Sequence, residues 1–285
     1  MDKKRAQIQT VAVVAFSFLL AFSAARSNTT GRGELGELQI AMRNLNRVDN
    51  LQMSYVYTIR QNASEGGEAM DVWANLLTGS WMSKHYTTDE DGTRLYLRQF
   101  CDGKDIYHYI DWNGGWEKIQ TTGEGGTAVP QLQMMTTLGY DGGDVLELKR
   151  QEQDGSVEII CSFAPEFLEE AKEAQLAQLE RSYAMYEKSG VGESEIDTAE
   201  LSVEQHRQSR YETVTATYTI DENQILQKAS YETTIIMPEI VQDLDGNKSL
   251  GKERKMQITV DMEIERYNQG GINNQIEQCR NEMMY

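Results

Sequence analysis

Hydrophobic and polar residues alternate along most of the chain between residues 50 and 265. A first clear run holds Met53, Tyr55, Tyr57 and Ile59 with mostly polar residues between them. A period of two is typical of a strand with one dry face and one wet face. Turn sequences such as 113–114 (Asn-Gly) separate the runs and favour hairpins. The expected strands cover residues 53–59, 70–76, 81–87, 94–100, 106–112, 115–119, 145–150, 157–163, 213–220, 225–237 and 256–264.

A period of three to four residues marks the expected helices. Leu35, Leu38, Met42 and Leu45 form one apolar stripe at this spacing, which predicts a helix that opens the folded part of the chain. The acidic segment 190–209 is expected to be a loop with a helical turn. The expected helices cover residues 35–48, 130–138, 165–188 and, more weakly, 272–285.

The order of these elements predicts an α+β fold. A sheet of about nine to eleven antiparallel strands cannot stay flat, because the twist between neighbouring strands accumulates. We therefore expect a strongly curved antiparallel β-sheet, or half-barrel, with helices packed on its concave face. The helices expected to fill that face are 35–48, 130–138 and 165–188.

The first 25 residues have the three parts of a secretory signal peptide. Lys3, Lys4 and Arg5 precede an apolar run over 11–25, which ends in small residues that suit a cleavage site. The apolar run is shorter than the roughly 20 residues that span a bilayer. Cleavage is the favoured outcome and an uncleaved N-terminal anchor is the alternative, so the protein is expected to be extracytoplasmic, either secreted or anchored.

The predicted organisation has four parts. Residues 1–25 form the signal peptide or anchor and residues 26–33 a linker. One half-barrel domain covers residues 34–267, and residues 268–285 form a C-terminal tail with a weak helix.

Charge excludes one class of partner. The 27 Lys and Arg residues face 45 Asp and Glu residues, which gives a formal net charge of -18. Nucleic acid binding needs a basic surface, so nucleic acid is not an expected partner. The protein is expected to be non-catalytic and to need no cofactor or metal, since the sequence holds no nucleophile elbow, phosphate-binding loop, dinucleotide fingerprint or zinc-ligand spacing.

The three cysteines leave two possibilities open. Export would permit a disulfide, and Cys101 and Cys161 both lie in or at the end of expected strands. The alternative to a bond between them is a set of buried free thiols.

Three short segments resemble the LolA/LppX-type proteins. They are residues 102–107 (Asp-Gly-Lys-Asp-Ile-Tyr), 115–118 (Gly-Trp-Glu-Lys) and 218–221 (Tyr-Thr-Ile-Asp), in a chain whose amphipathic helix leads into an antiparallel meander. The resemblance would cover roughly residues 34–267. It implies an exported half-barrel protein of the bacterial cell envelope, with a curved sheet closed by helices around an apolar cavity that can hold acyl chains. Many members are lipoproteins, and this sequence departs from them because no Cys follows the signal region.

Aromatic residues and methionines are the candidate lining of such a cavity. Aromatic rings offer contact area with a polar tip, and methionines adapt to irregular apolar ligands. Ordinary cross-strand and core packing is the alternative interpretation of the same residues. The candidate ligand-binding residues are Tyr55, Tyr57, Trp73, Trp81, Met134, Met135, Met256 and Met262.

Three functions are therefore compared. The first is an exported envelope protein that binds a hydrophobic small molecule or lipid with acyl chains, with a membrane surface or an envelope protein as a further partner. The second is a non-catalytic protein-interaction or sensory module whose cavity is filled by its own side chains, with function in loops 190–209 and 242–252. The third, an envelope hydrolase, would need a polar cleft that the sequence does not reveal.

Overall fold

The structure is a computed structural model, and it describes residues 33–61, 64–89, 92–112, 115–121, 129, 132, 135–136, 140, 143–189, 193–243 and 247–284. The expected signal peptide lies outside these residues, as does most of the helix expected at 130–138. Among the described residues, no helix has both the length and the apolar character needed to cross a membrane.

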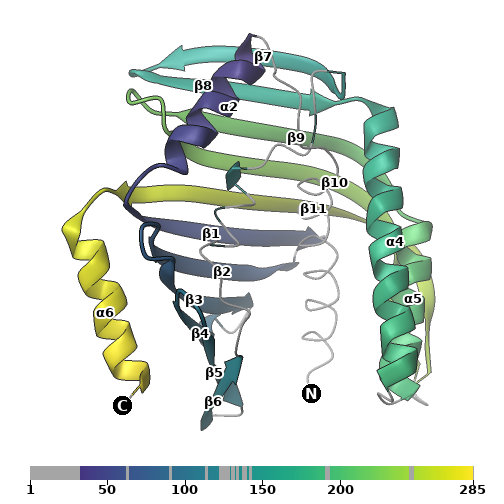
Figure 1. Cartoon of the computed structure of the whole chain (residues 1–285). Coiled ribbons are helices and arrows are strands. Elements are labelled where there is room, and N and C mark those ends of the chain that lie inside the picture. The colour runs from purple at the N-terminus through teal and green to yellow at the C-terminus, as the bar shows by residue number, and fades with distance from the viewer. Residues whose placement is uncertain are drawn as a thin grey trace.

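Eleven antiparallel strands form one sheet in the order β6-β5-β4-β3-β2-β1-β11-β10-β9-β8-β7 (Figure 1). The predicted α+β half-barrel is confirmed, since the sheet is strongly curved and helices lie against it. The strands are β1 (Asn50–Gln61), β2 (Ser64–Asn75), β3 (Ser80–Asp89), β4 (Gly92–Asp102), β5 (Ile106–Trp112), β6 (Gly115–Thr121), β7 (Val145–Gln153), β8 (Ser156–Phe163), β9 (Arg210–Ile220), β10 (Leu226–Gln242) and β11 (Lys248–Tyr267).

The central pairing joins the two ends of the chain. β1 pairs with β11, and Tyr57 lies opposite Val260 in this register. Each strand then pairs with its neighbour along the sequence, so β1 to β6 form one arm of the sheet and β7 to β11 form the other. Alternate residues of every strand therefore face either the inner, concave side or the outer side.

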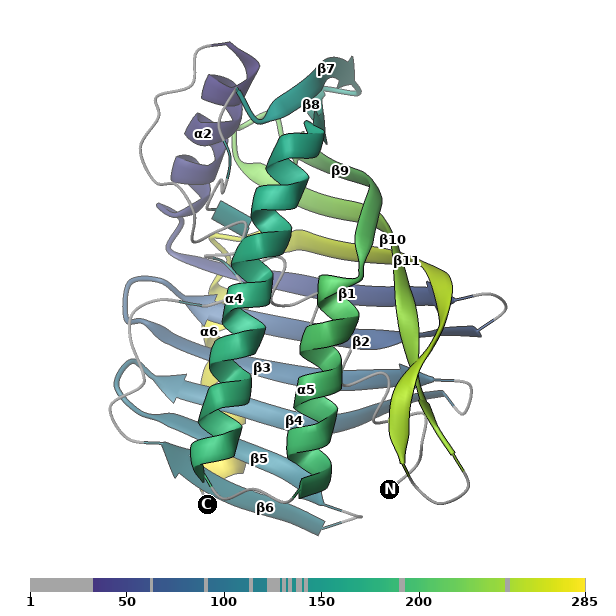
Figure 2. The same ribbon diagram turned by 90° about the vertical axis from the view of Figure 1, so that its right-hand side faces the viewer.

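The four helices whose bounds are given below, all within the described residues, lie on the two sides of the sheet. Figures 1 and 2 show α4 and α5 side by side on one side of the sheet, with α6 on the other. The helix α2 packs against β9 and β10, while α4 packs chiefly on α5, and α5 in turn on β10 and β11. Their bounds are α2 (Glu34–Leu45), α4 (Pro165–Ser189), α5 (Glu193–Arg207) and α6 (Gly270–Met284).

The helix α5 corrects one expectation, because segment 190–209 is mostly helical. Its buried face carries Ser202, Val203, Gln205 and His206, so an apolar stripe is nearly absent. The Gln205 amide donates a hydrogen bond of 2.6 Å to the Pro238 carbonyl, at a point where the register of β10 and β11 shifts. A helix that docks through polar side chains gives little hydrophobic periodicity, and the prediction of a loop was wrong for that reason.

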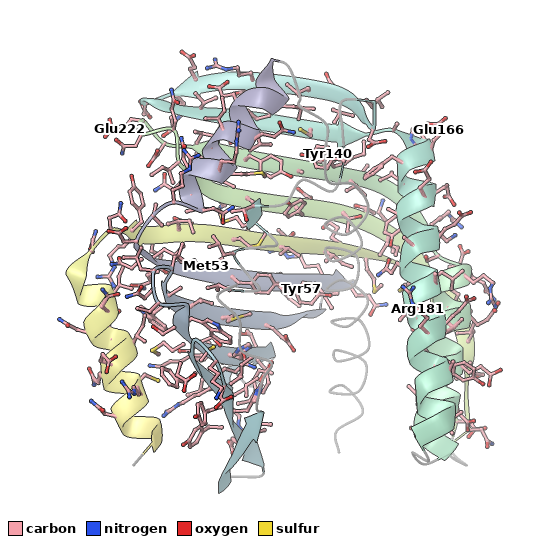
Figure 3. The ribbon with its side chains drawn as sticks, viewed as in Figure 1. Met53, Tyr57, Tyr140, Glu166, Arg181 and Glu222 are labelled. Atoms are coloured by element: carbon pink, nitrogen blue, oxygen red, sulfur yellow. The ribbon has the colours of Figure 1, made fainter. Side chains whose placement is uncertain are left out.

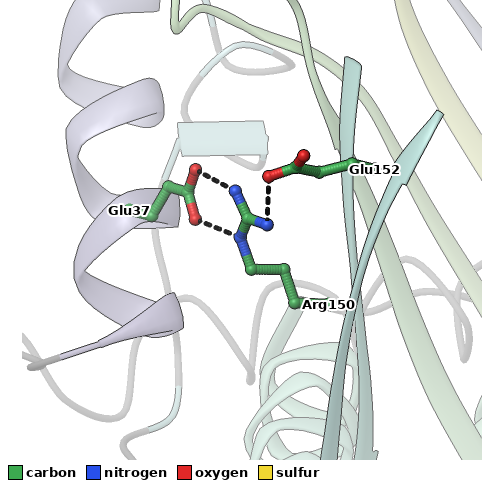
Figure 4. A network of polar contacts seen from close by, with 3 residues as sticks. All are labelled: Glu37, Arg150 and Glu152. Carbon is green, nitrogen blue, oxygen red and sulfur yellow. Dashed lines mark hydrogen bonds and ion pairs between the residues drawn. The ribbon is translucent and has the colours of Figure 1, made fainter. Parts of the chain in front are cut away.

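The edge strand β7 is tied to α2 by a cluster of charged side chains (Figure 4). The Arg150 guanidinium donates two hydrogen bonds to the Glu37 carboxylate, at 2.9 and 3.2 Å, and a third to Glu152 at 2.6 Å. The two-pronged contact fixes the direction of the guanidinium plane as well as its position. It therefore helps to hold α2 across the end of the sheet.

The helix α6 covers part of the outer face. Ile272 and Ile276 are almost completely buried there against an apolar layer from β2 to β5. Full burial of such a side chain stabilises the folded state by about 1.5–3 kcal/mol. This layer is formed by Trp73, Met82, Phe100 and Tyr107, with Cys279 from α6.

The α6 layer can be tested with Ile276→Ala. We expect this variant to lower the free energy of unfolding by about 2–4 kcal/mol, because it removes a buried side chain and leaves a cavity. Ile40→Ala is the matched control, since Ile40 is 43% exposed on α2. Urea unfolding should show a change within about 0.5 kcal/mol for the control. Equal changes in both variants would contradict the packing of α6 on the sheet.

Candidate functional site

Six of the eight candidate lining residues lie in one inner cluster of buried side chains. This cluster covers the concave face, and residues of α2 and the first turns of α4 close its margins. Figure 3 shows Met53 and Tyr57 on β1 with Tyr140 nearby, whereas Glu222 and Arg181 lie at the periphery. The six residues are Tyr55, Tyr57, Trp81, Met135, Met256 and Met262.

The other two candidates have different positions. Trp73 lies on the outer face, where it packs with Met82 and with Ile276 of α6. It follows the inward-facing Val72 directly, and adjacent residues of a strand point to opposite sides of the sheet. Trp73 therefore does not line the inner face. Met134 lies outside the described residues.

One part of the inner face, over β8 to β10, is filled by a chain of tyrosine hydroxyls. Tyr140 donates to Tyr218 at 2.9 Å, and Tyr218 lies 3.1 Å from the hydroxyl of Tyr231. Burial raises the pKa of all three, to about 12 for Tyr231. The Tyr140 hydroxyl also lies 3.7 Å from the sulfur of Cys161. The hydroxyls in this part form hydrogen bonds with one another, as buried polar groups in a packed core do.

All three cysteines are free and buried. The bond between Cys101 and Cys161 that the sequence left open is not formed. Cys101 is on β4 and Cys161 is on β8, and six strands lie between β4 and β8 in the sheet. Neighbouring strands lie about 4.8 Å apart, so the two thiols belong to distant parts of the inner face.

Four polar side chains form a network on the inner face of β3 to β5, which the sequence analysis missed. The Gln99 oxygen lies 3.2 Å from the Ser83 hydroxyl and 2.9 Å from Nε2 of His85, and both donate to it. The Gln99 amide donates to Nδ1 of His108 at 3.0 Å. Burial, which is the largest cause, lowers the pKa of His85 to about 4, although the hydrogen bond to Gln99 acts in the opposite direction.

The contact between Ser83 and His85 does not form a hydrolytic site. The Ser83 hydroxyl is 2.8 Å from Nε2 of His85, a separation that suits a nucleophile and its base. However, Ser83 is completely buried. Gln99 also accepts from the same imidazole nitrogen, so that nitrogen carries a proton and cannot take one from the serine. The network therefore orders the strands and leaves no reactive hydroxyl in reach of a substrate.

Beside this network, three polar groups lack the hydrogen bonds that link the hydroxyls of the tyrosine chain. The Glu68 carboxyl and the hydroxyls of Tyr55 and Tyr96 have no hydrogen-bond partner among the described residues, although Tyr55 is only 4% exposed. Burial raises the pKa of all three groups, and the charge of Glu68 adds to this for both tyrosines. Polar groups that lie on an apolar face without a partner among the described residues are suited to contact with water or a ligand.

The inner face over β2 to β5 also differs from that over β9 to β11 in the helices that pack on it. Among the described residues, the helices of the inner side pack on β9, β10 and β11, and α6 packs on the outer side. We refer to the inner-face residues Tyr55, Tyr57, Glu68, Met70, His85 and Tyr96 as the tyrosine patch; their side chains come from β1 to β4.

A separate cavity of about 440 Å³ lies between α6 and the ends of β2 to β4. Phe100 and Ile276 form its apolar part, and Lys104 and Arg280 bring positive charge to it. Gly103 shapes the neighbouring turn with a φ of +93°, and a Cβ atom there would come within 2.7 Å of the Thr78 carbonyl. This cavity is on the outer side, and none of the described candidate lining residues is part of its wall. Its remaining walls are Asn75, Thr78, Ser80, Asp102, Asn273 and Glu277.

No protein-family model matches this sequence, and no curated protein matches it. Among solved structures, the chain is similar to LprF from Mycobacterium bovis, with 12% identity, a TM-score of 0.34, and 81% of this chain and 91% of that chain covered. It is also similar to a LolA superfamily protein from Nitrosomonas europaea, with 11% identity, a TM-score of 0.24 and coverage of 81% and 93%. A DUF1329 family protein from Desulfovibrio piger gives 10% identity, a TM-score of 0.27 and coverage of 85% and 95%.

The half-barrel predicted from the LolA/LppX resemblance agrees with the curved eleven-stranded sheet. No site residue is transferred from the similar structures.

The difference between the two parts of the inner face predicts different effects for two Tyr→Phe variants. Tyr218→Phe removes a hydroxyl that holds two others, so we expect the free energy of unfolding to fall by about 1–2 kcal/mol. Tyr55→Phe removes a hydroxyl without a partner and should change it by less than about 0.5 kcal/mol. Chemical unfolding monitored by circular dichroism measures both. A loss for Tyr55→Phe as large as that for Tyr218→Phe would show that its hydroxyl is paired after all.

Two buried histidines predict a loss of stability in mild acid. Burial lowers the pKa of His85 and of His206 to about 4, whereas a histidine in the unfolded chain has a pKa of about 6.5. The unfolded chain therefore binds more protons between these values, and the free energy of unfolding falls as the pH is lowered from 6.5 towards 4. Urea unfolding across this range should give a shallower pH dependence for the double variant His85→Gln/His206→Gln. An unchanged slope would mean that neither ring resists protonation in the folded chain.

Proposed function

We propose that this protein is an extracytoplasmic binding protein that holds a hydrophobic ligand with an acyl chain against the tyrosine patch of the half-barrel. The observation that carries the proposal is an apolar inner face on which the Tyr55 hydroxyl and the half-buried Glu68 carboxyl have no hydrogen-bond partner among the described residues. Ligand sites in proteins combine these two features, because apolar surface supplies affinity and a few polar groups set the orientation.

The residue types of the inner face support an acyl chain. Met70 and Tyr55 lie opposite each other on β2 and β1, and Met262 lies opposite Tyr55 on the next strand. Thioether side chains adapt to an irregular apolar guest, and tyrosine rings offer wide contact at a low entropic cost. The curvature of the sheet aligns these side chains along one trough.

The N-terminal segment supports the proposed location. Residues 1–25 have the charge and hydrophobicity of a signal for export, so the mature domain would work outside the cytoplasm. A carrier or receptor for acyl chains suits that location because its cargo is poorly soluble in water and must be shielded from it.

Met70→Gln tests the proposal, since it places a polar amide on the inner face with little change in volume. We expect it to weaken the binding of a fluorescent fatty-acid probe by roughly tenfold, because the amide loses its water without gaining a partner. Val56→Gln is the matched control, as Val56 lies on the outer side of β1 and is 41% exposed. Fluorescence titration of the delipidated protein measures the affinities, and thermal unfolding confirms that both variants are folded.

Native mass spectrometry of gently purified wild-type protein gives a second readout, and we expect a bound lipid. If no lipid copurifies and no probe binds, the proposal is wrong. The inner face is then filled by the protein itself, as a protein-interaction or sensory module would require.

A further inference from the structure

Glu68 holds a central place in the tyrosine patch. It lies opposite Tyr57 on β1 and opposite Thr87 on β3, and Tyr55 is its diagonal neighbour on β1. Side chains that face each other across an antiparallel pair have Cβ atoms about 4.5–5.5 Å apart, and diagonal neighbours remain within reach of aromatic side chains. Tyr96 reaches the same area from β4, where an extra residue shifts the register opposite His85, and its ring contacts that of His85 at 6.2 Å.

The Glu68 carboxyl has no countercharge within the described part of the chain. No Lys, Arg or His among the described residues forms an ion pair with it. Arg94, which follows Thr87 in the same cross-strand row, forms its ion pair with Asp111. Burial lowers the pKa of the nearby His85 to about 4, so this ring supplies no positive charge near neutral pH.

A carboxyl in this position makes the empty protein less stable. Burial disfavours its charged form and raises its pKa. The protein has 45 acidic residues, most of which meet water at little cost. An acidic side chain beside tyrosine rings on the inner face, with no hydrogen-bond or ion-pair partner among the described residues, is suited to a complementary group on a ligand.

We propose that Glu68 and the rings of Tyr55, Tyr57 and Tyr96 form a binding site for a positively charged head group, an ammonium carried by the hydrophobic ligand. This inference rests on the proposed function and adds the chemistry of the ligand's polar end. The carboxylate attracts the cation through a medium of low polarity, where charges interact more strongly than in water. The negative faces of the tyrosine rings attract the same cation, which is how aromatic cages bind quaternary ammonium groups.

The site predicts a ranking of head groups on a common chain. Four decyl compounds serve as probes, namely decyltrimethylammonium, decylamine, decanol and decanoate, each below its micelle-forming concentration. Isothermal titration calorimetry on the delipidated full-length folded protein should show that the two cations bind most tightly, decanol more weakly and decanoate most weakly. Glu68→Gln should lower the affinity for decyltrimethylammonium by roughly tenfold or more and leave that for decanol within about twofold.

Glu263→Gln is the control variant, because Glu263 is exposed on the outer side of β11 and loses the same charge. It should leave every affinity unchanged. Glu68→Gln should also raise the melting temperature of the protein without ligand at neutral pH, since it removes a buried charge. A variant that is more stable and yet binds the cation less well cannot be explained by misfolding.

The outcomes distinguish the proposed acyl-chain function from the proposed head-group site. If all four decyl compounds bind equally well and Glu68→Gln changes nothing, the head-group site is wrong and the acyl-chain function stands. If decanol fails to bind while tetramethylammonium binds in a way that depends on Glu68, the cation site stands and the acyl-chain function is wrong. If none of these compounds binds the wild-type protein, both are wrong.

Discussion

Strand twist is the constraint on which this structure depends. Neighbouring strands rotate by about 20–25° relative to each other, and eleven of them in one sheet cannot form a flat layer. The sheet bends, and different helices then pack on its inner and outer faces. The helices α2, α4 and α5 meet the inner side of the β9 to β11 arm, and α6 meets the outer side of the β1 to β3 strands. The helices thus stabilise the two arms on opposite sides.

The inner face is chemically divided as a result. Over β8 to β10, the hydroxyls of Tyr140, Tyr218 and Tyr231 bond to one another, and that region has the character of a solid core. Over β1 to β4, the polar ends of Tyr55 and Glu68 have no such partners among the described residues. Binding sites commonly carry groups that reduce stability until a ligand arrives. The tyrosine hydrogen bonds and the groups proposed to meet a ligand therefore lie on different strands of one sheet.

Much of the fold follows from the sequence because hydrophobic alternation is a local signal. The run from Met256 to Ile264 predicts a strand, and its residues face inward in the order expected. Segment 190–209 was wrongly interpreted because α5 docks through Gln205 and His206, whose partners are far away in the sequence. Hydrogen bonds from side chains to distant backbone carbonyls produce no hydrophobic periodicity in the sequence.

The candidate site was only partly predictable for a related reason. Aromatic residues can be proposed from their type alone, and Tyr55, Tyr57 and Trp81, proposed in this way, lie on the inner face. The side to which each points depends on strand parity, and Trp73 was assigned to the wrong side because parity was not applied to it. Glu68 was missed because it is one of 45 acidic residues, and only the three-dimensional structure distinguishes a carboxyl among tyrosine rings from one in water.

The charged side chains of the edge strand β7 oppose the association of two copies of the protein through their sheet edges. An open sheet ends in strands whose unpaired backbone groups can recruit a strand from another copy. On β7, Lys149, Arg150 and Glu152 occupy mostly exposed positions, and the bond from Arg150 to Glu37 places a helix beside this border. Joining two copies along β7 would strip water from these charges and displace that contact. The charges of β7 thereby oppose growth of the half-barrel into fibrils along this edge.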